Sequence, residues 1–417
     1  MELKAFQDLV IAFLMRATGR SLEQLGPDTN FVRNGVVDSA LFTQLFAFVE
    51  ELIGRKIPTR GLKVGRFDTI RKIYEDHVAP ASPAAEAGAP AGELPLEMGG
   101  RAAARESAEP RVTGFAYRVG ELRPVQELGV EPDLVEILLA GGLETYSRAR
   151  QTAVELAQEA AGETLRLTSC APGDVDAVVF ANESVWSDGA VGQDKAGDMR
   201  REIYRALHGL GLTRAYPVGA GLSGCANMLA GVGMARGLIL TAGLRNVLVV
   251  GSDRRADGHR LIPPAVGVIS DGAASCLVTA KAGPGFIVEA LCQHADLSLH
   301  ESDLSKDFGR YLLEMGKAVK ALGERMRELT GRSADAYKRL VLNNYGASTM
   351  RMFAHQLGFR TDQMYRRNVA RLSHVAAADI AINLADLEAA GELQSGDRVM
   401  AFASGPVSWI MVAARKA

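Results

Sequence analysis

The chain has 417 residues, of which 47% are hydrophobic and 23% charged, and its formal net charge is -2. This composition is typical of a globular protein with two or three domains, and the small net charge argues against nucleic acid or a membrane surface as the main partner. We see no apolar run near the length that spans a bilayer and no signal-peptide core, so we expect a cytoplasmic protein. The four cysteines form no C-x-x-C pair and have no histidine cluster beside them, which predicts neither a metal site nor a disulfide framework.

The first 80 residues have the spacing of a small helical unit. Apolar residues recur at the helical period over 6–14 and again over 41–52, and a further helix is expected over 68–77. The second helix should begin with Asp38 as its N-cap and Ser39 as its first residue. An ordinary helix cap is one explanation of this Asp-Ser pair.

With Phe31 upstream and a unit of this size, residues 1–80 resemble the acyl carrier protein family. In that family the serine of an Asp-Ser-Leu motif, at the start of the second helix, carries a phosphopantetheine arm. The resemblance implies an all-α four-helix carrier domain, with covalent 4'-phosphopantetheine on Ser39, Asp38 as the motif's aspartate, and a phosphopantetheinyl transferase as partner. Ala40 stands where leucine is usual, and the second helix is unusually apolar for the family, which suits a single dedicated partner.

Residues 81–110 have a different character, because they are rich in alanine and proline and poor in large apolar residues. This composition predicts a linker. A flexible chain of about thirty residues spans roughly 30 Å, so a tethered carrier would reach a site on its own chain at high effective concentration. Tethering alone does not decide whether delivery occurs in cis or in trans.

Residues 111–417 alternate strand and helix signals, which indicates an α/β architecture. We expect strands over 176–180, 246–250, 274–278, 339–342, 398–402 and 408–412. We expect helices over 135–161, 198–207, 225–241, 304–329 and 374–390.

A weak internal repeat runs through this region. The order of strand, asparagine-containing loop, helix and strands occurs over 178–278 and again over 340–412. In a duplicated fold with a pseudo-dyad, the starts of the helices at Cys225 and His374 would face each other across one cavity. Nucleophile and base would then meet without being close in sequence.

Cys225 lies in a run of small residues, Gly221 to Met228, where an extended segment is expected to turn into a helix. The positive end of the helix dipole should lower the pKa of this thiol and favour its attack on a thioester. The alternative is a buried structural cysteine, as most free cysteines are.

Four motifs occur in order along residues 111–417, and the first of them contains Cys225. They are Leu222-Ser223-Gly224-Cys225-Ala226, Val249-Val250-Gly251-Ser252-Asp253, Ser270-Asp271-Gly272-Ala273-Ala274 and Phe402-Ala403-Ser404-Gly405-Pro406. With this set, the region resembles the thiolase superfamily, closest to β-ketoacyl-acyl carrier protein synthase III. The resemblance implies a duplicated thiolase-like α/β fold and a homodimer, which we expect to pair through residues 246–250.

The expected catalytic set departs from synthase III because its histidine and asparagine are exchanged. Asn343 and Asn344 occupy the usual histidine position, and His374 occupies the usual asparagine position. By resemblance, His374 takes the Cys225 proton, one of the two asparagines donates a hydrogen bond to a thioester oxygen, and the backbone N–H groups of Cys225 and Ser404 form an oxyanion hole. Which asparagine acts stays open. No cysteine stands near Ser404, which argues against a true thiolase.

Three functions remain open. The first, slightly preferred, is decarboxylative condensation of an acyl-Cys225 with an extender carried on Ser39, in specialised metabolism. The second is acyl transfer without decarboxylation, which forms an ester, amide or thioester. The third is a non-catalytic partner that positions the carrier. In the first two, the donor would be an acyl-CoA or an acyl carrier protein, phosphopantetheine would be the cofactor, and no metal is expected.

Overall fold

The computed structural model describes residues 1–19, 21–22, 24–31, 36, 45, 48–55, 57, 67–79, 109–183, 196–263, 266–300 and 308–417. The chain divides into two compact units, Met1–Gly100 and Arg101–Ala417. Asp38, Ser39 and nearly all of the expected linker lie outside the described residues.

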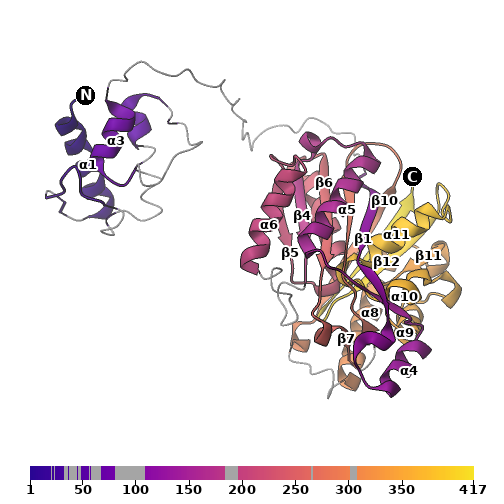
Figure 1. Ribbon diagram of the computed structural model, residues 1–417. Helices are drawn as coiled ribbons and strands as arrows, with labels where there is room; N and C mark the ends of the chain where they lie inside the picture. The colour runs from indigo at the N-terminus through magenta and orange to yellow at the C-terminus, as the bar shows by residue number, and fades with distance from the viewer. Residues whose placement is uncertain are drawn as a thin grey trace. The chain divides into compact units, whose positions relative to one another are not determined.

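The described part of the N-terminal unit contains helices and has its own apolar core. Its elements are α1 (Leu3–Thr18), α3 (Ile70–Ile73) and the helical turn η2 (Tyr74–Val78) (Figure 1). The core consists of buried apolar side chains from α1, from α3 and from the segments between them: Phe6, Val10, Leu14, Leu25, Phe31, Leu45, Val49, Ile57, Phe67, Ile70 and Ile73. The helical period expected over 6–14 is confirmed, because α1 turns one face to this core.

The C-terminal unit is built on a sheet that has nine strands within the described residues. The strands of this unit are β1 (Arg111–Val119), β2 (Glu121–Pro124), β3 (Thr145–Arg148), β4 (Ala177–Ala181), β5 (Tyr216–Ala220), β6 (Asn246–Asp253), β7 (Leu261–Ile262), β8 (Gly267–Val268), β9 (Gly272–Thr279), β10 (Phe286–Ala295), β11 (Arg339–Val341), β12 (Arg398–Ser404) and β13 (Ser408–Lys416). The main sheet has the order β11-β12-β13-β10-β1-β9-β6-β4-β5. The pairs β2–β3 and β7–β8 form two small separate sheets.

The helices and helical turns lie between these strands in the sequence. They are η3 (Val125–Leu128), α4 (Pro132–Ala140), α5 (Ala153–Thr168), η4 (Pro172–Asp174), α6 (Ala196–Gly209), η7 (Gly224–Ala226), α7 (Asn227–Ala242), η8 (Asp257–His259), η9 (Leu297–Leu299), α8 (Phe308–Thr330), η10 (Ala334–Ala336), α9 (Ala347–Leu357), η11 (Thr361–Gln363), α10 (Arg367–Leu372), η12 (Ala376–Ala378) and α11 (Asp379–Ala389).

The main sheet repeats one pairing pattern, which confirms the predicted duplication. In the first half, β1, β9 and β6 pair antiparallel in turn, and β6 pairs parallel with β4. In the second half, β10, β13 and β12 pair antiparallel, and β12 pairs parallel with β11. Strand β5 extends the first half, and no described strand extends the second half in the same way.

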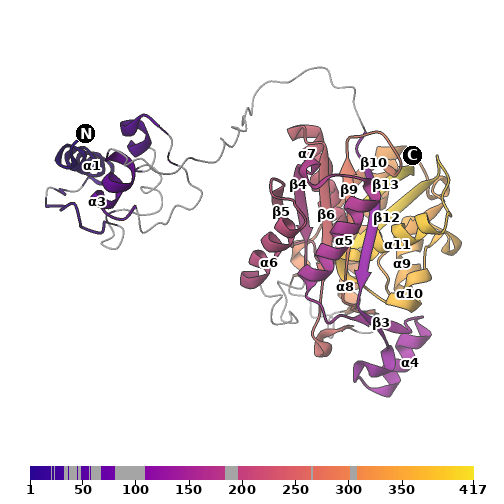
Figure 2. The same ribbon diagram turned by 45° about the horizontal axis from the view of Figure 1, so that its top comes forward.

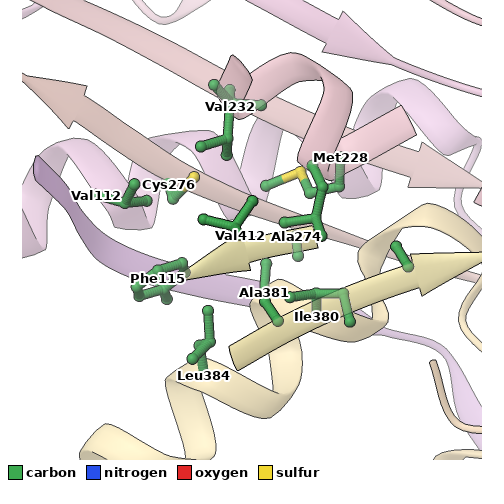
Figure 3. Packing of buried hydrophobic residues seen from close by; sticks show 14 of the residues in the cluster. Val112, Phe115, Met228, Val232, Ala274, Cys276, Ile380, Ala381, Leu384 and Val412 are labelled. Carbon is green, nitrogen blue, oxygen red and sulfur yellow. The ribbon is translucent and has the colours of Figure 1, made fainter. Parts of the chain in front are cut away.

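The two halves enclose a central layer that contains α7 and α11. Helix α5 packs on β1, β6 and β9, whereas α8 packs on β10 and β13 (Figure 2). Helices α7 and α11 each contact strands of both halves. Figure 3 shows the side chains of Met228 and Val232 from α7 and of Ile380, Ala381 and Leu384 from α11, which pack with strand residues in one buried cluster.

The expectation that the chain has no apolar run near the length that spans a bilayer is wrong, because η7 and α7 together form one. The 19-residue segment Gly224–Ala242 contains a window with a mean hydropathy of 1.3, so by length and composition alone it is long and apolar enough to cross a membrane. The helix is apolar because it lies in the central layer, where Leu229, Val232 and Ile239 are buried against the sheet. Half of this apolar window is buried inside the fold.

Two further expectations are wrong. The single helix expected over 135–161 is interrupted after α4 by Gly141 and Gly142, and a separate helix, α5, begins after Thr152, which forms a reciprocal capping box with Glu155.

The strand expected to pair two protomers, β6, is interior, because it bonds to β9 on one side and β4 on the other. Strand β5 is the edge on this side of the described sheet.

The central layer should dominate the stability of the C-terminal unit. Leu387 of α11 is fully buried in it, so Leu387→Ala should lower the free energy of unfolding by about 2–5 kcal/mol. Tryptophan fluorescence during denaturant unfolding reports on this unit, since both tryptophans fall within it. The matched control is Leu329→Ala on the exposed face of α8, which should change stability little. Equal losses in both variants would contradict the packing described here.

Candidate active site

The turn that carries Cys225 is held from both sides. The Ser223 N–H donates to Asn227 Oδ1 at 2.9 Å, which ties the approach to the first turn of α7. Gly224 has φ +56°, and a Cβ at this position would come within 2.4 Å of the Pro406 ring. Glycine is therefore needed here both for the backbone conformation and for the close approach of the 404–406 loop.

The loop that carries His374 is fixed by its backbone. Ser373 and Ala376, on either side, adopt φ values of 50° and 41°, which are uncommon for residues with a side chain. The His374 N–H donates to the Val268 carbonyl at 2.9 Å, and the His374 carbonyl accepts from the Ser270 N–H at 2.8 Å. The imidazole is fully buried beside the Tyr345 ring, with 4.8 Å between ring centroids.

These two loops bring the predicted nucleophile and base together. Nε2 of His374 lies 3.0 Å from Sγ of Cys225, across 149 positions in the sequence. Nδ1 of His374 lies 2.5 Å from Oδ2 of Asp379, the first residue of α11. The carboxylate accepts a hydrogen bond from Nδ1–H, which leaves Nε2 as the acceptor that faces the thiol. The arrangement is a Cys-His-Asp triad.

Asp379 is a residue that the sequence reasoning missed. Its side chain is fully buried and also accepts from the N–H of Val375 at 2.7 Å and the N–H of Asn344 at 2.8 Å. An acidic residue five positions after His374, at the start of a helix, was the available signal.

The two candidate asparagines have different surroundings. Nδ2 of Asn344 donates to Asp379 at 3.0 Å, and Oδ1 of Asn344 accepts from Asn383 at 2.9 Å. Asn344 therefore supports Asp379 and is not available to a thioester. Nδ2 of Asn343 is buried and has no hydrogen-bond partner among the described residues, which makes Asn343 the available donor.

The Ser404 N–H was expected to be one donor of the oxyanion hole, but it already has an acceptor. Its N–H donates to Oδ1 of Asn343 at 2.9 Å, so this N–H is occupied and orients the Asn343 amide. The Ser404 carbonyl accepts from the Tyr345 hydroxyl at 3.0 Å. The Cys225 N–H lies in the first turn of η7, where a helix leaves N–H groups without an intrahelical acceptor. The donors that remain from the prediction are therefore the Cys225 N–H and Asn343 Nδ2.

Glu183 is the second residue that the sequence reasoning missed. Oε2 of Glu183 lies 3.1 Å from Sγ of Cys225. Its backbone N–H donates to Oδ1 of Asp253 at 2.8 Å, and its Oε1 lies 3.5 Å from Nη2 of Arg255. Glu183 follows β4 and Asp253 ends β6, so the parallel register of these two strands places the carboxylate beside the thiol.

The surroundings of Cys225 act against the pKa expected from the helix dipole. Burial raises the pKa of the Cys225 thiol well above its ordinary value, and the nearby carboxylates of Glu183, Asp253 and Asp379 raise it further. The expectation of a lowered pKa is therefore wrong: a negative surrounding favours the neutral thiol over the thiolate. Nucleophilic attack then requires a base that removes the proton as the reaction proceeds.

Cys225 opens into a cavity of about 170 Å³. Its lining is mainly apolar and aromatic, with Glu183 and Cys225 as the acidic and nucleophilic groups: Glu183, Cys225, Ile262, Pro263, Val266, Ile269, Tyr311, Met315, Tyr345, Thr349, Phe353, Ser404, Gly405 and Pro406. Within the described ranges, no group of three or more His, Cys, Asp or Glu side chains is placed to hold a metal ion.

A family model matches the part of the chain that carries several residues of this site. Residues 328–414 match the family model described as 3-oxoacyl-[acyl-carrier-protein] synthase III C terminal. This segment contains Asn343, His374, Asp379 and Ser404. No curated protein matches the chain in sequence.

Solved structures establish the fold of the C-terminal unit as thiolase-like. The 3-oxoacyl-[acyl-carrier-protein] synthase III of Aquifex aeolicus VF5 is 17% identical with a TM-score of 0.60, over 73% of this chain and 99% of its own. The corresponding FabH of Pseudomonas aeruginosa PAO1 is 21% identical with a TM-score of 0.59, over 74% and 98%. The acyltransferase ChlB3 is 18% identical with a TM-score of 0.62, also over 74% and 98%.

The effect of Glu183 on the thiol can be measured directly. Because its negative charge raises the pKa of Cys225, Glu183→Gln should move the pH profile of Cys225 alkylation by iodoacetamide to lower pH. Mass spectrometry of the labelled Cys225 peptide gives the rate at each pH. Glu328→Gln, which removes an exposed carboxylate from the far end of α8, should leave the profile unchanged. A profile unchanged or moved to higher pH in Glu183→Gln would contradict the assignment.

Proposed function

We propose that the chain is an acyltransferase that carries its acyl group on Cys225. One observation supports this most strongly: Sγ of Cys225 lies 3.0 Å from a histidine whose other nitrogen is held by a buried carboxylate. This is the geometry of an activated nucleophile with an oriented base. A non-catalytic partner would not require it.

In the acylation step, His374 takes the thiol proton while Sγ attacks the carbonyl carbon of an acyl thioester. The Cys225 N–H and Nδ2 of Asn343 are the donors available to the oxyanion of the tetrahedral intermediate. When the intermediate collapses, the bond to the donor's sulfur breaks and His374 returns the proton to that sulfur. The products are acyl-Cys225 and a free thiol, with His374 neutral again.

The donor is proposed to be a short-chain acyl thioester of coenzyme A or of an acyl carrier protein. A cavity of about 170 Å³ is smaller than the 300–1,000 Å³ typical of pockets for drug-sized ligands. Its apolar lining suits a hydrocarbon chain rather than a charged group. The fold supports the thioester class of donor.

The N-terminal unit is proposed to be a carrier with phosphopantetheine on Ser39, attached by a phosphopantetheinyl transferase. The support is the sequence pattern around Asp38 and Ser39, together with a compact unit that has its own apolar core. The arm would supply a thiol that holds an acyl group as a thioester. Participation in specialised metabolism stays a prediction.

A homodimer is also proposed, now through β5. The supports are its edge position in the described sheet, the exposed side chain of Tyr216, and a cavity of about 680 Å³ between β5 and α6. An unpaired edge strand is a ready template for a second strand.

The proposed acylation predicts a covalent intermediate. Incubation with acetyl-CoA or butyryl-CoA should add one acyl group to Cys225, detected by intact-protein and peptide mass spectrometry, and Cys225→Ala should take up none at that position. Phosphopantetheinylation should add one arm to Ser39 and none to Ser39→Ala. If Cys225 stays unmodified with every acyl thioester tested, the proposed function is wrong.

Asp379 should control this step through His374. Asp379→Asn should slow acylation of Cys225 by roughly 10³–10⁴-fold, because the amide no longer holds the imidazole with Nε2 as the acceptor. Quenched-flow mass spectrometry measures the rate, and tryptophan fluorescence unfolding checks that the variant is folded. A loss smaller than tenfold would show that Asp379 does not orient the base.

A further inference from the structure

We propose that Glu183 is the base of the second half-reaction: it takes a proton from an alcohol or amine acceptor and returns that proton to Sγ of Cys225. This inference rests on the proposed function, because it requires an acyl group on Cys225. It names the class of acceptor, which is a neutral group that carries its own proton.

Sγ of Cys225 lies between two proton acceptors. Nε2 of His374 is 3.0 Å away, and Oε2 of Glu183 is 3.1 Å away. A thiol has one proton, so it can serve only one of the two acceptors at a time. One base is enough for acylation, which leaves the second without a role in that step. Glu183 even opposes acylation, because its charge favours the neutral thiol.

The two acceptors differ in their access to the cavity. His374 is fully buried and does not line the cavity, whereas Glu183 lines it. An acceptor molecule that reaches acyl-Cys225 through this cavity therefore passes the carboxylate of Glu183. Of the charged side-chain types Asp, Glu, Lys and Arg, Glu183 alone occurs among the described lining residues.

Glu183 is held in place by groups from two neighbouring elements. Its N–H is bonded to Asp253 at the end of β6, and Oε1 lies 3.5 Å from Arg255 just beyond that strand. Glu183 also faces Cys225, which belongs to η7. Tyr311 of α8 lines the same cavity, but its hydroxyl donates to the Pro406 carbonyl. Arg255 balances the charge on one oxygen while the other faces the reacting sulfur.

The proposed step balances in protons and bonds. The acceptor's oxygen or nitrogen attacks the thioester carbon as Glu183 takes the acceptor's proton. The tetrahedral intermediate then collapses, the C–S bond breaks, and Cys225 leaves as a thiolate. Protonated Glu183 transfers its proton to Sγ, across the 3.1 Å contact of the resting state. The products are the acylated acceptor and a Cys225 thiol, with Glu183 ionised again.

Charge separates this acceptor class from a malonyl thioester. A malonyl group would bring a carboxylate into a mainly apolar cavity beside Glu183, and no lysine or arginine occurs in the described lining to offset the repulsion. This inference departs from the slight preference for decarboxylative condensation stated from the sequence.

The test separates the two half-reactions on the full-length chain. Acetyl-Cys225 protein is prepared with acetyl-CoA, freed of excess donor, and mixed with ethanol, ethanolamine or malonyl-N-acetylcysteamine. Loss of the acetyl group and the products formed are followed by quenched-flow mass spectrometry. We expect Glu183→Gln to acylate at least as fast as the unmodified chain but to discharge to the neutral acceptors about 10²–10⁴-fold more slowly.

The outcomes distinguish this inference from the proposed function. Glu328→Gln is the matched control, and it should acylate and discharge like the unmodified chain. Absence of acetyl-Cys225 in the unmodified chain would overturn the proposed function and this inference together. Normal acylation followed by unchanged discharge in Glu183→Gln would overturn only the inference. Release of carbon dioxide with a β-ketoacyl product from malonyl-N-acetylcysteamine would overturn it as well.

Discussion

The buried carboxylate of Asp379 is the constraint on which the site depends. A carboxylate with no exposed surface must be surrounded by donors, because an unpaired buried charge is strongly unfavourable. Here the donors are His374, the N–H of Val375, and both the backbone and side chain of Asn344. Satisfying this one charge fixes the imidazole, the loop before α11 and the end of β11 together. The removal of one donor should therefore disturb more than one part of the site.

The same concentration of negative charge determines how the thiol reacts. Three carboxylates near Cys225 keep it neutral, so reactivity comes from a base positioned at the sulfur rather than from a stable thiolate. Glu183 and His374 lie at similar distances from Sγ, but of the two only Glu183 is among the residues that line the cavity. We interpret this difference to mean that the two bases act in different steps: His374 in acylation of Cys225, and Glu183 in transfer of the acyl group to the acceptor.

Much of the fold follows from local sequence, but the contacts of the site do not. Each of the six strands expected by apolar pattern overlaps a strand, and the repeat identified the duplicated halves. Strand β1, the middle strand of the nine, and its neighbour β10 were missed because their pairing is set by distant segments. Cys225 and His374 could be found by motif, and Asp379 carried a local signal. Glu183 carried none, because its contact with Cys225 spans 42 positions and depends on the register of β4 on β6.

A crystal structure of the chain trapped as acetyl-Cys225 would test the central claim most directly, because it would show which groups face the bound acyl group. We predict the thioester oxygen within hydrogen-bond distance of Nδ2 of Asn343 and the Cys225 N–H. We also predict the Glu183 carboxylate on the open side of the carbonyl carbon, where an acceptor would attack. The account would be contradicted by an acyl oxygen bonded to neither donor, or by a Glu183 side chain turned away from the cavity with His374 exposed in its place.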